Sequence, residues 1–111
     1  MNPQVILDWA DNLVAIDPTT IRPAAQDSAC YHGHGNPCQM IWIAVELAGI
    51  SHQDGRQLIA SFFGLSDLKS LKHLTIAQLM AVYRFRDTLG ELYVQSISGV
   101  HSARTGSLTT G

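Results

Sequence analysis

The apolar residues near the start of the chain recur at the spacing of one face of an α-helix. They are Ile6, Trp9, Leu13 and Ile16. Asn2 followed by Pro3 is a helix-start signal, because a proline at the first helical position loses no hydrogen bond. Asp17 precedes Pro18 and is therefore pushed out of the α region. We predict a first helix between Pro3 and Asp17.

A nearly continuous apolar run, Met40 to Val45, predicts a buried second helix. We expect it to start at or near Pro37 and to reach Ala48. Gly49 then suits a left-handed cap, and Ile50 provides the hydrophobic contact that usually follows one. The composition of the run also permits a strand. A helix that is apolar around most of its circumference is either buried or part of an oligomer interface.

A third helix is predicted after Ser51, which forms a variant capping box with Asp54. Its inward stripe has the i, i+1, i+4, i+5 spacing of a buried helix face. The stripe consists of Leu58, Ile59, Phe62 and Phe63. Gly64 ends the helix. The short turn that follows has leucines at three-residue spacing, as in one or two turns of tight helix; they are Leu65, Leu68 and Leu71.

The last helix begins at a full capping box, Thr75 with Gln78. One side of it carries Leu79, Val82, Leu89, Leu92 and Tyr93, and we expect it to continue past residue 95. Gly90 weakens it by roughly 1 kcal/mol relative to alanine. The predicted core draws on these elements: Trp9, Leu13, Ile41, Trp42, Val45, Leu58, Ile59, Phe62, Leu65, Leu74, Leu79, Val82 and Leu89.

These patterns predict an all-α fold, a single compact bundle of four to five short helices in residues 1–96. A long connection separates the first helix from the second, with one turn of helix around Ile21 to Gln26. Residues 97–111 are rich in Ser, Thr and Gly and are predicted to form a flexible polar tail.

Composition adds few constraints on function. At 46% hydrophobic and 14% charged residues, the chain can bury a core. No basic segment precedes an apolar one at the N-terminus, and the longest apolar run is too short for a bilayer, so we expect a cytoplasmic protein with no membrane partner.

Residues 1–54 hold six acids and one base, whereas residues 55–111 hold six bases and three acids. The two halves attract each other, or the second half binds an anionic partner.

The segment CYHGHGNPC places four zinc-type ligands, Cys30, His32, His34 and Cys38, within nine residues. That number suits a tetrahedral zinc site, but the spacing is not that of the known fingers. A Cys30–Cys38 disulfide and two free thiols are the alternatives. Cys38 near a helix start could also act as a nucleophile, with a nearby histidine as base. We expect no cofactor unless this loop binds zinc.

A second group of candidate residues is basic. Between Lys69 and Arg86 there are four bases and no acid. The candidate phosphate contacts are Lys69, Lys72, His73, Arg84 and Arg86. An ordinary solvated turn is the alternative, and the sequence pI near 6.1 opposes strong nucleic-acid affinity.

Residues 40–83 resemble the GemA-type regulatory proteins of Mu-like phages. The matching pieces are Ile41, Ile43, Ala44, Leu47 and Gly49, then Arg56–Gln57–Leu58, Phe63–Gly64–Leu65–Ser66, Ser70–Leu71–Lys72, Leu74–Thr75, Gln78 and Val82. The acidic N-terminal helix and the CYHGHGNPC loop have no counterpart in that family. The resemblance implies a phage- or mobile-element-derived regulator that acts around DNA, directly or through a protein partner.

We therefore predict a non-enzymatic regulatory or adaptor protein acting on DNA or on a DNA-bound complex. The alternatives are a self-associating protein-interaction module without nucleic acid, and a small metal or thiol protein using the Cys30–Cys38 loop. Met40 and Trp42 cannot easily share a core face with Ile41 and Val45, so we expect them at a homodimer interface.

Overall fold

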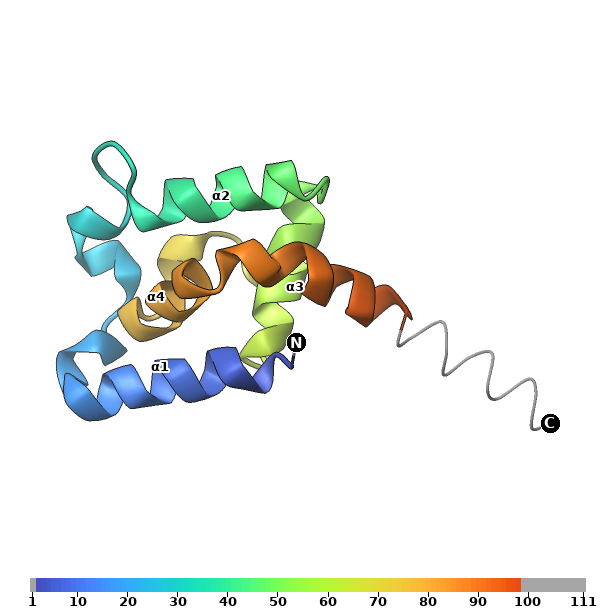
Figure 1. Cartoon of the computed structure of the whole chain (residues 1–111). Coiled ribbons are helices and arrows are strands. Elements are labelled where there is room, and N and C mark those ends of the chain that lie inside the picture. Colours follow the sequence, from blue (N-terminus) through green and yellow to red (C-terminus); the bar gives the residue numbers. More distant parts are fainter. Residues whose placement is uncertain (1, 99–111) are drawn as a thin grey trace.

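Five helical segments account for most of residues 2–98, the part of the chain that the computed structural model describes (Figure 1). Four are the labelled helices α1 (Gln4–Ile16), α2 (Pro37–Leu47), α3 (His52–Phe62) and α4 (Ile76–Arg84), and the fifth is residues 89–98. Short 3₁₀ turns connect them: η1 (Pro18–Ile21), η2 (Ala24–Gln26), η3 (Ser28–Cys30), η4 (Leu71–His73) and η5 (Arg86–Thr88). The predicted all-α bundle of short helices is confirmed.

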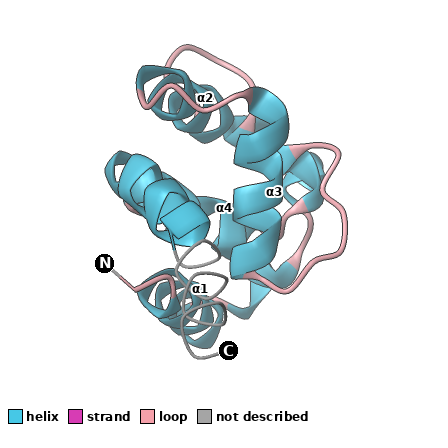
Figure 2. Ribbon diagram, turned by 90° about the vertical axis from the view of Figure 1, so that its right-hand side faces the viewer, coloured by secondary structure: helices cyan, strands magenta, loops and turns pink. Residues whose placement is uncertain are grey.

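α1 and α2 lie on opposite sides of the molecule, and α4 lies between them (Figures 1 and 2). α3 crosses behind this layer and follows α2 after a tight turn. α2 ends with the predicted left-handed cap: Gly49 has a φ of 74°, and the backbone amide of Ile50 donates to the Val45 carbonyl at 3.1 Å. The left-handed glycine reverses the chain so that α3 packs against α2.

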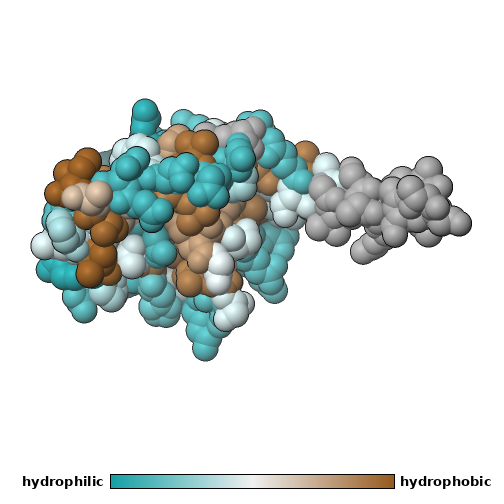
Figure 3. Space-filling model, turned by 90° about the horizontal axis from the view of Figure 1, so that it is seen from below, coloured by the Kyte–Doolittle hydropathy of each residue, from teal (hydrophilic) through white to brown (hydrophobic). Residues whose placement is uncertain are grey.

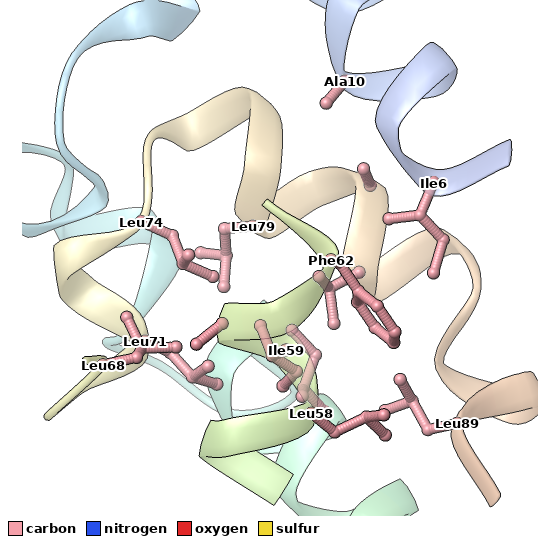
Figure 4. Close-up of a cluster of buried hydrophobic side chains, with 14 of the residues drawn as sticks. Ile6, Ala10, Leu58, Ile59, Phe62, Leu68, Leu71, Leu74, Leu79 and Leu89 are labelled. Carbon is pink, nitrogen blue, oxygen red and sulfur yellow. The ribbon is translucent and has the colours of Figure 1, made fainter. Parts of the chain in front are cut away.

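The core is made mainly of aliphatic side chains, together with Phe62, and all four labelled helices contribute to it (Figure 4). Ile59 of α3 and Leu79 of α4 are fully buried, and Ile6 and Ala10 bring α1 onto the same cluster. Leu65, predicted to be buried, is 37% exposed. Leu68 and Leu71 are buried instead, because the turn after α3 directs the next two leucines of the series inward.

The connection between α1 and α2 contains more regular structure than the single helical turn that the sequence predicts. It contains three 3₁₀ turns, and two of them begin at an aspartate cap: Asp17 accepts from the Thr19 amide, and Asp27 accepts from that of Ala29. An isolated antiparallel bridge, Pro23 with Thr75, ties this segment to the start of α4.

The last predicted helix is interrupted. α4 ends at Arg84, and η5 separates it from the helical residues 89–98. At the break, both the amide and the hydroxyl of Thr88 donate to the Phe85 carbonyl, at 3.0 and 2.6 Å. The predicted tail, residues 97–111, begins inside this last helical segment, and residues 99–111 lie outside the described residues.

Candidate nucleic-acid interface

Two segments that are far apart in the sequence meet at one surface. They are the histidine loop, residues 31–36, and the basic turn, defined here as Lys69, Lys72 and His73. The Nζ atom of Lys72 lies 4.2 Å from the centroid of the Tyr31 ring. Such a cation–π contact contributes about 0.5–1 kcal/mol at an exposed site. It therefore favours a position of the Lys72 ammonium beside the loop.

Tyr31 is held in place from its own side of this contact. It follows η3, whose Cys30 is buried in the core, and its hydroxyl donates to the Ala25 carbonyl at 3.3 Å. His32 packs on the Tyr31 ring with centroids 4.7 Å apart, tilted by 43°. The imidazole of His32 is exposed. An exposed ring therefore lies next to a fixed ring that carries a lysine ammonium.

The rest of the histidine loop has a defined shape. Gly33 and Gly35 have φ values of 89° and 73°, which favour glycine. The Asn36 side chain donates to the Gly33 carbonyl at 2.9 Å and accepts from the Gln39 amide, which caps α2. The Gly35 amide donates to the Gln39 side chain at 2.9 Å. The loop therefore closes on the start of α2 and projects from the top left of Figure 1.

The basic turn is anchored by leucines. Leu68, Leu71 and Leu74 are buried at three-residue spacing, whereas the basic residues between them are exposed. Ser70 begins η4 by accepting a hydrogen bond from the Lys72 amide at 3.2 Å. The same spacing that buries the leucines thus presents the charges to solvent.

The two predicted arginines form a separate group. Arg84 is the last residue of α4 and Arg86 begins η5, and α4, with nine residues, is about 13 Å long. Arg84 is exposed and its guanidinium carbon lies 5.9 Å from the Phe85 ring centroid. Arg86 is half-buried, stacks at 4.5 Å on the Tyr83 ring and donates to the Tyr83 carbonyl at 2.8 Å. Arg86 therefore has a structural partner of its own.

The predicted zinc ligands have contrasting environments. Cys30 is buried and Cys38 half-buried, both as free thiols, whereas His32 and His34 are exposed. Within residues 2–98, no three or more side chains of His, Cys, Asp or Glu are grouped as a metal site would require. The sequence grouped these four residues by proximity along the chain, and the fold gives them different surroundings.

Burial also changes the acidity of the cysteines. Burial raises the pKa of Cys38 to about 11, with a smaller contribution from the neighbouring Cys30 and an opposing one from Lys72. The pKa of Cys30 is also raised, chiefly by burial. A nucleophilic cysteine needs the opposite shift.

Of the two predicted interface residues on α2, Trp42 packs against its own chain. Trp42 is half-buried and stacks on His52 of α3, with centroids 4.6 Å apart. His52 Nε2 and Glu46 Oε1 are 2.9 Å apart across the α2–α3 turn. Met40 is also half-buried. The large apolar side chains of α2 that reach solvent are Ile43, 40% exposed, and Leu47, 84% exposed.

Hydrophobic side chains reach the surface elsewhere too. The face seen from below in Figure 1 shows them in separate patches between hydrophilic ones (Figure 3). Among the helices of residues 2–98, none combines the length and apolar character needed to cross a bilayer.

Sequence reasoning missed Tyr31 as part of this surface. Its position within the CYHGHGNPC segment was visible, but its contact with Lys72 depends on the fold. No known family model, curated protein or solved structure matches this chain.

Proposed function

We propose that this protein is a non-enzymatic regulatory or adaptor protein that acts on DNA or on a DNA-bound complex. The observation that carries the proposal is the contact of Lys72 with Tyr31, which joins the basic turn to the histidine loop. The resemblance of residues 40–83 to phage regulators of the GemA type points in the same direction.

The arrangement suits a nucleic-acid strand in two ways. Lys69 and Lys72 are exposed and can neutralise phosphates, and the exposed ring of His32 can stack on a base. Lysines next to aromatic rings are a common arrangement at single-strand sites. The two lysines alone imply modest affinity, because each neutralised phosphate contributes only one released counterion.

The test is an anisotropy titration of labelled duplex and single-stranded DNA at several salt concentrations. Lys69→Ala and Lys72→Ala should each weaken binding and reduce the slope of log K against log salt by about 0.9 on duplex DNA. Arg22→Gln is the matched control, since Arg22 is an exposed base on the connection before α2. Arg84→Ala shows whether the contact extends to the far end of α4. Absence of binding to either DNA at low salt would contradict direct contact with DNA.

A second candidate function is a self-associating protein-interaction module. The observation that favours it is the exposure of Leu47 on α2, at 84%. With Ile43, 40% exposed one turn earlier on the same helix, Leu47 forms a small apolar area that a second subunit could cover. The interface predicted at Met40 and Trp42 would then lie further along α2, at Ile43 and Leu47.

A further inference from the structure

A groove of about 630 Å³ runs between α3 and residues 65–69. Ligand pockets range over roughly 300–1,000 Å³, so the volume suits a small ligand or a short peptide segment. One wall comes from α3, where Gln53, Gln57 and Ser61 recur at four-residue spacing on one face. The other wall is the segment that leads into the basic turn.

The charges in the groove favour an anionic occupant. Arg56 on α3 and Lys69 on the opposite wall line the groove together with Asp67. Within residues 2–98, neither base forms an ion pair, because no carboxylate lies within 4.0 Å of either. Two bases against one acid leave a net positive charge. A guanidinium donates two parallel hydrogen bonds to a carboxylate, which makes Arg56 a suitable anchor.

The remaining surface favours a peptide over a nucleic-acid backbone. Ala60 and Leu68 are buried beneath the groove, and Leu65 is 37% exposed along it. Apolar side chains of a peptide can cover Leu65. The amides of Gln53 and Gln57 can donate to and accept from a peptide backbone. A phosphodiester chain carries a charge at every nucleotide, so one of its phosphates would meet Asp67.

We propose that this groove binds an acidic peptide segment of a partner protein, with one carboxylate placed between Arg56 and Lys69. The site is distinct from the Tyr31–Lys72 contact, and Lys69 is the residue that borders both. The inference therefore goes beyond DNA contact: it identifies a second surface, through which an adaptor would hold a protein.

The experiment is an NMR titration of the labelled full chain with a short capped peptide that has a central glutamate between leucine and alanine residues. Saturable shifts are expected at Arg56, Gln57, Ser61 and Lys69. The same peptide with lysine in place of glutamate should give none of them. Arg56→Gln should weaken binding about tenfold, whereas Arg22→Gln, which removes an exposed base outside the groove, should leave binding unchanged.

Asp67→Asn provides a gain of affinity that a folding defect cannot imitate. It removes the negative charge that opposes the ligand, so binding should strengthen by about two- to fivefold. Equal shifts from the lysine peptide, or an unchanged affinity in Arg56→Gln, would each overturn the proposal. The DNA affinity of Arg56→Gln separates the two sites. If DNA binds at Lys72, the variant should bind DNA as tightly as the wild-type chain does, whether or not it still binds the peptide.

Discussion

Gly90 lies so close to Ala48 that a Cβ atom at position 90 would be 3.2 Å from the Cβ of Ala48. The glycine therefore allows the helix at residues 89–98 to approach the end of α2. Gly90→Val should overpack this contact and lower the free energy of unfolding by about 2 kcal/mol. Gly90→Ala should be nearly neutral, because the gain of about 1 kcal/mol in helix propensity offsets a slight displacement of Ala48.

Urea denaturation of each variant measures these effects. The control is the double variant Gly90→Val with Ala48→Gly, which removes the opposing methyl group and should recover part of the loss. Additive effects of the two substitutions would show that the positions do not interact.

The capping box at the start of α4 leads to a second prediction. The Gln78 amide donates to Thr75 Oγ1 at 3.1 Å, and the Thr75 amide donates to Gln78 Oε1 at 3.0 Å. Thr75→Ala should cost about 1 kcal/mol of stability, whereas Thr75→Ser should cost little because it keeps the acceptor. Thermal unfolding followed by circular dichroism measures both. Equal losses in the two variants would assign the effect to the threonine methyl group.

Such caps could be predicted because their signals are local. Thr75 with Gln78, and Gly49 with Ile50, contain the cap and its partner within a few residues of sequence. The break between α4 and residues 89–98 could not be predicted from the sequence. Val82 and Leu89 are seven positions apart, a spacing that a continuous helix also satisfies. The interruption occurs where η5 contacts α2, which is a tertiary effect.

The candidate site shows the same division. The basic turn was predictable as a charged segment, because Lys69, Lys72 and His73 are neighbours in sequence. The Tyr31 ring under Lys72 was not, because the two residues are brought together only when η2 packs against η4. Grouping residues by proximity in sequence also placed Arg84 and Arg86 with the turn, although α4 separates them from it.

Cys38 provides a pH-dependent prediction. Because its pKa is raised to about 11, the thiolate is rare at neutral pH. At pH 8 about one molecule in a thousand is ionised, compared with about a quarter for an ordinary thiol. Alkylation of native Cys38 by iodoacetamide should therefore be slow. Its rate should rise about tenfold per pH unit up to about pH 11, provided that the fold persists.

Peptide mapping by mass spectrometry follows this reaction at each cysteine. In urea the burial is lost, so both cysteines should react at the ordinary rate at pH 8. Rapid alkylation of native Cys38 at pH 7 would contradict the environment described here and would restore it as a candidate nucleophile.

Self-association through α2 is the last prediction. Leu47 is 84% exposed and Ile43, one turn earlier on the same helix, is 40% exposed, so the two form a short apolar stripe. If a second subunit covers this stripe, Leu47→Gln should shift the mass in sedimentation equilibrium from dimer to monomer. Ile16→Gln is the matched control, because Ile16 is 82% exposed at the end of α1 and its loss should leave the mass unchanged. A monomeric mass for the wild-type chain at micromolar concentration would contradict the dimer. In that case the exposed Leu47 would remain available to a different protein.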